Sequence, residues 1–271
     1  DDTARSIKAM GTNTDIELMG GLGFQFTGSY AMILRKYMKK YGWKQQHFAK
    51  IASKNKYNGS LNPHAQYQKP MSAEEILNSR VVSWPITLYM CSTMGDGAAA
   101  AIVCSKEVAN EISQKQPITI AACSLRSGEV TGDDDGQIHV SHDAYEMSGI
   151  GPEDIEIAEV HDAMAPGEMY RIEKLGFFRA EEVGQLVDEG YFAISGKLPV
   201  NTSGGLAARG HPIGATGLAQ ICEIVWQMQG RAGKRQVKGR MGPYPKIGLT
   251  QNSGGYIGGS PAALTVTILK R

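Results

Sequence analysis

Residues 201–217 combine one histidine with a high density of glycine. The segment reads NTSGGLAARGHPIGATG and places His211 directly before Pro212. Glycine lets a backbone approach a ligand or a second loop closely, and proline stiffens the turn that presents the imidazole. A histidine held in this way can act as a general base or as a hydrogen-bond donor to an oxyanion. The alternative is a tight structural turn with an incidental histidine, because a lone glycine loop is a weak signal.

Two further segments offer groups for the same chemistry. His161 and Asp162 follow an alternating run at 155–160 that predicts a strand, and residues 251–259 form a second glycine-rich turn, QNSGGYIGG. Loops at strand ends are where α/β proteins assemble their sites. Two imidazoles and a turn with unpaired N–H groups suit acyl chemistry, in which an oxyanion must be stabilised. Alternatively, a backbone carbonyl satisfies His161, Asp162 caps the next helix, and 251–259 is only a hairpin.

The surrounding pattern alternates between helices and strands, which predicts a layered α/β fold. Helices are expected at 30–41, 44–54, 73–78, 106–113, 166–175, 180–188 and 218–229, and strands at 98–104, 118–124, 155–160, 246–250 and 262–269. The run at 98–104 suits a buried helix or a strand, and its Asp-Gly boundary favours the strand. Residues 55–72 are rich in Asn, Gly and Pro and are expected to form a polar, turn-rich excursion.

Composition excludes several classes of function. The net charge of +1 over 271 residues gives no electrostatic footprint for nucleic acid or an anionic membrane. No apolar run approaches the roughly 18 residues of a membrane span, and no signal peptide is visible, so we expect a cytoplasmic protein. The four cysteines form no CxxC pair, which argues against zinc and against disulfides. The acidic run at 133–135 near His139 and His142 is typical of a solvated loop, so no metal site is predicted.

The segments around His161, His211 and residues 251–259 together resemble the C-terminal part of the thiolases. The resemblance is strongest to the sterol-carrier-protein type and its bacterial and archaeal acetyl-CoA acyltransferase-like relatives. The resemblance covers nearly the whole chain and rests on HFAKI at 47–51, GDGAAAA at 95–101, His161-Asp162, and the runs 201–220 and 232–237. It implies an α/β fold with layers in the order α-β-α-β-α. Residues 1–80 would form the loop domain over the acyl-CoA, 81–110 the end of the N-terminal half, and 111–271 the C-terminal half.

The resemblance also implies roles for individual residues. His211 would deprotonate a nucleophilic cysteine and then share an oxyanion hole, and His161 would stand at the first oxyanion-hole position, where the classical enzymes have Asn. Backbone N–H groups near Ser253 and Gly254 would help to form the second hole. We call residues 201–217, which carry His211, the histidine loop. The residues expected to support it are Asn201, Gly210 and Pro212.

The chain departs from the family pattern at the cysteines. The family's nucleophile lies in the N-terminal half, and none of Cys91, Cys104, Cys123 and Cys222 matches its turn. Three explanations stay open: the chain is a fragment, the nucleophile is on another polypeptide, or the protein does no cysteine chemistry. The family's second acid/base cysteine is also replaced, by Gln251 or Ala163, neither of which transfers a proton. His161, a bound water or Tyr256 would have to serve instead.

The implied activity is thiolytic cleavage of a 3-oxoacyl-CoA, or the reverse condensation, with coenzyme A as co-substrate and no bound cofactor. Two alternatives are a thiolase-like retro-aldolase that acts on a β-hydroxyacyl-CoA and a non-catalytic acyl-CoA-binding subunit. The expected assembly is a homodimer or homotetramer, with a small zinc-ribbon/OB-fold subunit as a further candidate partner. Aromatic and bulky side chains either line the acyl pocket or pack amphipathic helices: Phe24, Phe26, Tyr30, Met32 and Trp43.

Overall fold

A computed structural model describes residues 17, 23, 25–112, 117–128, 136–256 and 261–271. The helices are α2 (Phe26–Tyr41), α3 (Gln45–Ser60), α4 (Ala73–Leu77), α5 (Lys106–Ile112), α6 (Gly136–Ser148), α7 (Gly167–Lys174), α8 (Ala180–Asp188), α9 (Gly205–Arg209) and α10 (Thr216–Met228). Short 3₁₀ turns are η2 (Leu88–Met90), η3 (Pro152–Asp154) and η4 (Gly233–Arg235). The strands are β1 (Val81–Ser83), β2 (Ile86–Thr87), β3 (Thr119–Arg126), β4 (Ile157–Glu159), β5 (Ile247–Gly254) and β6 (Ala263–Lys270).

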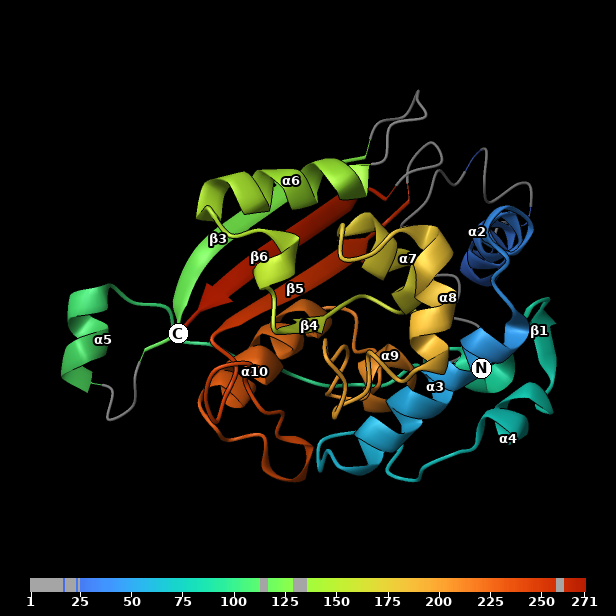
Figure 1. The fold of residues 1–271 in the computed structure, drawn as a ribbon, viewed down its shortest axis with the longest axis horizontal. Helices are drawn as coiled ribbons and strands as arrows, with labels where there is room; N and C mark the ends of the chain where they lie inside the picture. The colour runs from blue at the N-terminus through green and yellow to red at the C-terminus, as the bar shows by residue number, and fades with distance from the viewer. Residues whose placement is uncertain (1–16, 18–22, 24, 113–116, 129–135, 257–260) are drawn as a thin grey trace.

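A four-stranded mixed sheet in the order β3-β6-β5-β4 forms the centre of the fold (Figure 1). The pairs β3–β6 and β5–β6 are antiparallel, whereas β4 and β5 run parallel. Helix α6 packs against β3 and β6, and α10 packs against β5 and β4 on the opposite face. The two faces carry separate apolar clusters: Ala158 and Ile268 belong to the main core, and their neighbours Ile157 and Leu269 pack with Ile224. This alternation is expected of strands buried on both faces.

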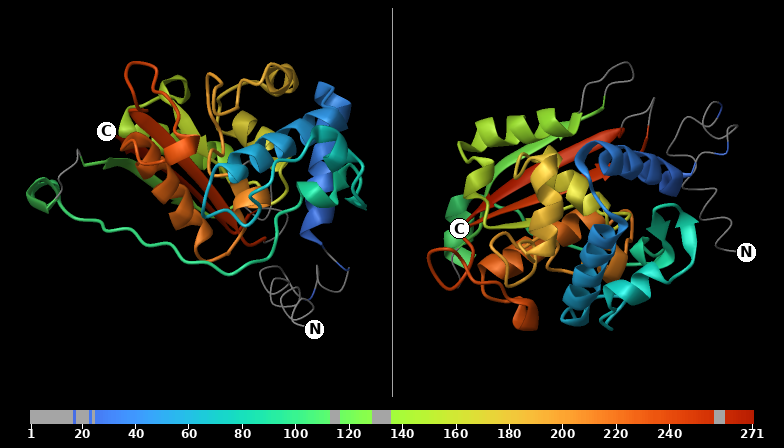
Figure 2. Two further views of the ribbon diagram at one scale, coloured as in Figure 1. Left: turned by 90° about the horizontal axis from the view of Figure 1, so that it is seen from below. Right: turned by 45° about the vertical axis from the view of Figure 1, so that its right-hand side comes forward.

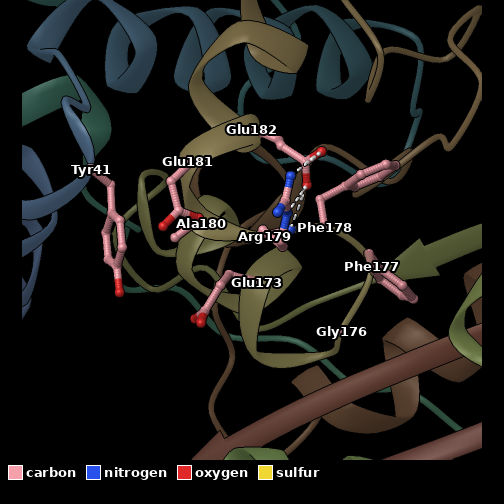
Figure 3. A pocket seen from close by; sticks show the side chains of 9 residues that line it. All are labelled: Tyr41, Glu173, Gly176, Phe177, Phe178, Arg179, Ala180, Glu181 and Glu182. Atoms are coloured by element: carbon pink, nitrogen blue, oxygen red, sulfur yellow. Dashed lines mark hydrogen bonds and ion pairs between the residues drawn. The ribbon is translucent and has the colours of Figure 1, made fainter.

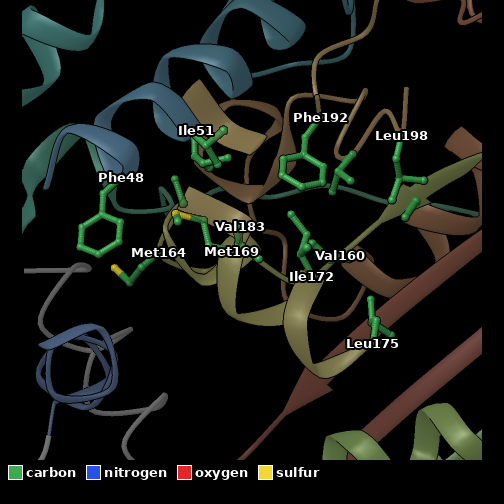
Figure 4. Close-up of a cluster of buried hydrophobic side chains, with 14 of the residues drawn as sticks. Phe48, Ile51, Val160, Met164, Met169, Ile172, Leu175, Val183, Phe192 and Leu198 are labelled. Atoms are coloured by element: carbon green, nitrogen blue, oxygen red, sulfur yellow. The ribbon is translucent and has the colours of Figure 1, made fainter. Parts of the chain in front are cut away.

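The main core joins the sheet to the helices beside it. Figure 4 draws part of this core, in which Phe48 and Ile51 of α3, Met169 and Ile172 of α7 and Val183 of α8 belong to one apolar cluster. These side chains are fully or almost fully buried. The same packing fixes α3 next to the loops that leave β4. The N-terminal helices are therefore part of the core that supports the site.

The predicted alternation of helices and strands is confirmed, and four of the five predicted strands match β3 to β6 within a few residues. The prediction of a strand at 98–104 was wrong. In the described structure this segment pairs with no strand, and Figure 2 shows it as a long extended trace leading to α5. Ile102 is 90% exposed and Val103 75% exposed. A strand is defined by hydrogen bonds to a neighbouring backbone, so an apolar run without such a neighbour stays irregular.

The turn-rich excursion expected from residue 55 begins six residues later than predicted, because α3 continues to Ser60. Gly59 lies against the backbone of another segment: a β-carbon at this position would be 2.7 Å from the β-carbon of Ala208 and 2.9 Å from the carbonyl oxygen of Tyr67. Tertiary contact therefore extends a helix through residues of low helix propensity.

The domain boundaries at residues 80 and 110 stay predictions. Among the described residues, no helix has the length and apolarity needed to cross a bilayer.

The contact between α10 and the sheet depends on one glycine. A β-carbon on Gly248 would lie 2.4 Å from Cγ2 of Ile224. We expect Gly248→Ala to push α10 away from β5 and to lower the free energy of unfolding by about 1–3 kcal/mol. Urea denaturation measures this change. Gly254→Ala is the matched control in the same strand, because its added methyl group meets nothing within 4 Å; equal stability of the two variants would contradict the prediction.

Candidate active site

Two loops that leave the same edge of the sheet bring His161 and His211 together. Val200 forms a parallel bridge with Ala158 of β4, and the amide of Asn201 donates to the carbonyl of Ala158. The ring centroids of the two histidines lie 5.0 Å apart, with an interplanar angle of 82°. The structure thus brings together two side chains that are 50 positions apart in the sequence.

The hydrogen bonds of Thr216 determine which nitrogen of His211 carries the proton. The Thr216 hydroxyl donates to the carbonyl of Pro212 at 3.0 Å, and its oxygen lies 2.8 Å from Nδ1 of His211. Because a hydroxyl has a single proton, this oxygen accepts from Nδ1–H. The neutral ring then holds its lone pair on Nε2, which has no hydrogen-bond partner among the described residues. His211 is therefore arranged as a base.

Desolvation keeps both imidazoles neutral, although His161 is buried and His211 is only partly buried. Desolvation, with a smaller contribution from the charge of Arg209, lowers the pKa of His211 from 6.5 to about 4. Desolvation lowers the pKa of His161 well below its ordinary value, and the nearby His211, Arg171 and Arg209 add to this shift. A neutral imidazole can accept a proton at physiological pH, whereas an imidazolium cannot.

His161 is held by its backbone as well as by its ring. Its amide donates to Oε1 of Gln251 at 3.1 Å, and the Asn252 side chain is a hydrogen-bonding neighbour of the imidazole. The ring nitrogen Nδ1 is buried and has no partner within the described part of the chain. Both polar atoms of the Gln251 side chain are hydrogen-bonded: Oε1 accepts from His161, and Nε2 donates to Gln137 at 2.8 Å. It fixes the position of residue 161 and has no proton to transfer.

The residues expected to build a second oxyanion hole lie partly in a strand. Strand β5 extends to Gly254, and the ladder pairs Ser253 with Leu264. The Ser253 hydroxyl accepts from Arg171 at 2.9 Å. Tyr256 makes an edge contact with Phe26, with ring centroids 6.5 Å apart, so α2 lies beside this end of the sheet. Residues 257–259 of the predicted glycine turn lie outside the described residues.

The supporting loop residues differ in what they contact. Asn201 has a φ of 55° and donates from its side chain to Glu168, while its Oδ1 accepts from the amide of Val160. Gly210 ends α9 with a φ of 104°, a conformation that favours glycine. Pro212 supplies the carbonyl that holds Thr216.

None of the four cysteines makes a hydrogen bond with either histidine. The Cys91 thiol donates to the carbonyl of Thr87, and burial raises its pKa to about 11, which disfavours the thiolate. Cys222 donates to the carbonyl of Ala100, and burial also raises its pKa. Cys104 and Cys123 are exposed. The described residues hold no group of three or more side chains that is arranged to bind a metal.

Sequence reasoning missed a set of buried charges behind the loop. Glu159 is fully buried, accepts from the amide and hydroxyl of Ser203, and lies 3.6 Å from Arg209. Desolvation and the neighbouring Glu223 raise the pKa of Glu159 to about 7. In the sequence Glu159 resembles the polar half of an alternating strand, so no local signal marks it as buried.

A surface hollow of about 460 Å³ lies away from the histidine pair. Figure 3 shows its lining between Tyr41 and the segment that joins α7 to α8, with Arg179 paired to Glu182. Neither histidine lines it. The aromatic and bulky side chains considered for an acyl pocket are also dispersed: Trp43 is in the main core, whereas Met32 is 66% exposed.

Comparisons with known proteins identify the family of the chain. The model of the thiolase C-terminal domain-like family matches residues 134–271. The chain is 38% identical to an acetyl-CoA acetyltransferase of Methanothermobacter thermautotrophicus, over 96% of this chain and 68% of that protein. It is 39% identical to the benzoylsuccinyl-CoA thiolase subunit BbsB of Thauera aromatica, over 89% of this chain and 63% of that subunit. It is 38% identical to sterol carrier protein 2 of Oryctolagus cuniculus, but spans only 43% of its length.

Two solved structures share the fold at lower sequence identity. The Ltp2-ChsH2(DUF35) aldolase superposes with a TM-score of 0.74 at 24% identity, covering 89% of this chain and 62% of that one. A monomeric SCP2-thiolase like protein from Mycobacterium smegmatis gives 0.62 at 16% identity, over 90% of this chain and 51% of that one. The layered α/β architecture is therefore thiolase-like. With the family match over half of the chain, these findings show that the chain belongs to the thiolase family.

Proposed function

We propose that the protein is an acyltransferase of the thiolase type that acts on acyl-CoA thioesters, with coenzyme A as co-substrate. The observation that carries this proposal is the neutral, partly buried His211 with a free Nε2, edge-on to His161 at 5.0 Å between ring centroids. The names of relatives at 38–39% identity, an acetyl-CoA acetyltransferase and a CoA thiolase subunit, support the same class.

In the proposed reaction Nε2 of His211 removes the proton of a nucleophilic thiol. The thiolate attacks the 3-oxo carbonyl, and the bond between C2 and C3 breaks. The C2 fragment leaves as a CoA-thioester enolate that takes up a proton, and the acyl group stays on sulfur until the thiol of coenzyme A takes it. We assign the nucleophile to a cysteine outside these 271 residues, because the surroundings of Cys91 and Cys222 disfavour a thiolate. His161, the amides near Ser253 and Gly254, and the charge of Arg209 would stabilise the oxyanions.

Retro-aldol cleavage of a β-hydroxyacyl-CoA is the second candidate. Both reactions release a CoA-thioester enolate, but in retro-aldol cleavage the base that takes the β-hydroxyl proton can return it to the enolate. Thiolysis needs a separate second acid, so the lack of proton-transfer side chains at Ala163 and Gln251 favours the retro-aldol reaction. His161 or Tyr256 would have to supply that proton. Release of an aldehyde or ketone without consumption of coenzyme A would identify this reaction. Binding of acyl-CoA without turnover would identify a non-catalytic subunit.

The proposed assembly is a homodimer or homotetramer. A small zinc-ribbon/OB-fold subunit is a further candidate partner, and the two-part name of the Ltp2-ChsH2(DUF35) aldolase is in line with it. Co-purification of the native protein followed by mass spectrometry tests for this subunit.

Substitution of the two histidines tests the roles assigned to them. In the complete native protein we expect His211→Asn to lower kcat with 3-oxoacyl-CoA substrates by at least about 100-fold, because the base is lost. His161→Ala should cost about 100-fold through loss of a donor to the oxyanion. His161→Asn should restore most of the rate, because an amide can donate to the same oxygen. Undiminished turnover in His211→Asn would rule out its role as base.

Thr216 provides a test of the tautomer. Thr216→Val keeps the shape of the side chain but removes the oxygen that accepts from Nδ1–H of His211, so we expect kcat to fall by about 10-fold. Nitrogen chemical shifts of the imidazole should report a mixture of tautomers in this variant. Thr216→Ser retains the hydroxyl and should behave like the wild type. An unchanged tautomer in Thr216→Val would contradict the assignment.

The protonation of His211 can be followed directly by NMR titration. Its folded pKa of about 4 lies below the ordinary value of 6.5, so the neutral ring stabilises the fold fully above pH 6.5. This contribution is lost as the pH falls toward 4, because the unfolded chain binds the proton first. We expect the ring signal to titrate below pH 5. Titration of His211 near pH 6.5 would show that the ring is solvated.

A further inference from the structure

The loop that precedes His211 is held by one stretch of the N-terminal region. Six carbonyl oxygens within residues 200–209 accept hydrogen bonds from donors within residues 54–67. Side chains of Lys54, Lys56, Asn58 and Asn62 donate to the carbonyls of Val200, Ala207, Asn201 and Ser203. The amides of Gln66 and Tyr67 donate to the carbonyls of Arg209 and Ala208. The accepting carbonyls extend from Val200 to Arg209, the last residue of α9.

Backbone packing makes this contact close. A β-carbon on Gly204 would lie 2.8 Å from the Cα of Gly59. A β-carbon on Gly205 would lie 2.4 Å from Oδ2 of Asp162 and 2.9 Å from Nδ2 of Asn55. The loop is thus pressed between α3 on one side and the residue after His161 on the other. A shift of α3 relative to β4 would move the backbone of the loop.

Lys56 lies at the centre of this contact and is 1% exposed. Its ammonium group donates to the carbonyl of Ala207 at 2.6 Å and lies 4.0 Å from the ring centroid of Tyr67. Burial lowers its pKa to about 8, while nearby Asp162 and Cys91 oppose that shift. The amine is therefore mainly protonated at neutral pH. Burial of an ammonium group is costly, so its place requires compensating contacts.

We propose that Lys56 is a positioning residue for His211, acting through the carbonyl of Ala207 as the central member of a clamp formed by residues 54–67. Ala207 lies four residues before His211, and the carbonyl of Arg209, two residues before it, is held by the same stretch. The clamp fixes α9 and hence the point from which the imidazole projects toward His161. This inference rests on the proposed role of His211 as base.

The test combines hydrogen exchange, NMR and kinetics on the complete native protein. Lys56→Met keeps an apolar stem in the buried space but removes the ammonium donor. We expect the amides of Leu206 and Ala208 to exchange at least about 10-fold faster, because the α9 segment opens more often. The imidazole signal of His211 should shift. With an acyl-CoA substrate, kcat should fall by about 10- to 100-fold with little change in KM, because the base is misplaced.

Two further variants separate positioning from folding. Tyr67→Leu removes the ring beside Lys56 at a position that is 37% exposed, so it perturbs the same contact with a smaller risk to folding. We expect the same changes as in Lys56→Met, but smaller. Lys50→Met is the matched control, because Lys50 is an exposed lysine of α3 that pairs with Asp188 and, among the described residues, makes no hydrogen bond or ion pair with the loop. It should leave exchange, the His211 signal and kcat unchanged.

The outcomes distinguish this inference from the proposed function. If Lys56→Met and Tyr67→Leu leave loop exchange and the His211 signal as in the wild type, the positioning role is overturned, whatever the activity. If Lys50→Met changes them equally, the effect belongs to α3 as a whole and the assignment to Lys56 is also overturned. If the wild type transfers no acyl group but the exchange and NMR changes occur, the positioning role stands and the proposed function fails.

Discussion

The structure depends on satisfying the backbone of residues 200–209. This segment has positive φ angles at Asn201, Gly204 and Gly205, so its carbonyls do not follow one continuous helix or strand. A buried carbonyl without a hydrogen bond costs free energy comparable to a lost bond. Six of these carbonyls instead accept from donors within residues 54–67, while the amides of Asn201 and Ser203 donate to acceptors on β4. The histidine loop has its shape only where these partners are in place. The same hydrogen bonds therefore hold both the fold and the site.

Holding such a loop requires buried charge. Glu168 is fully buried between the Lys54 amine at 2.6 Å and two side-chain amides, and Asp162 accepts from the amide of Leu206 at 2.7 Å. On the other side, Glu223 pairs with Arg235 at 2.8 Å. The attraction within each pair compensates for the hydration that its two partners lose on burial. Because each of these carboxylates has more than one hydrogen-bonding or ionic partner, the contacts favour one arrangement of the loop over similar ones.

The same desolvation determines the chemistry of the histidines. A solvated imidazole would be partly charged at neutral pH, but burial beside Arg209 keeps His211 neutral, and burial does the same for His161. Thr216 then directs the remaining proton to Nδ1 and leaves Nε2 available. A base of this kind is weak toward water but suited to a thiol brought into contact with it, since the thiolate and imidazolium that form would stabilise each other.

The sequence by itself determined the local elements and the two histidines. Apolar periodicity places α10 and the strands β3 to β6, and glycine and proline mark the loop at His211, because these signals depend only on neighbouring residues. Tertiary structure decided the rest. Residues 55–60 contain Asn and Gly, which locally favour a turn, yet they continue α3 because Gly59 packs on Ala208 and Asn58 bonds the loop. Residues 98–104 have the composition of a strand, yet they form none, because pairing requires a second backbone that no local pattern supplies.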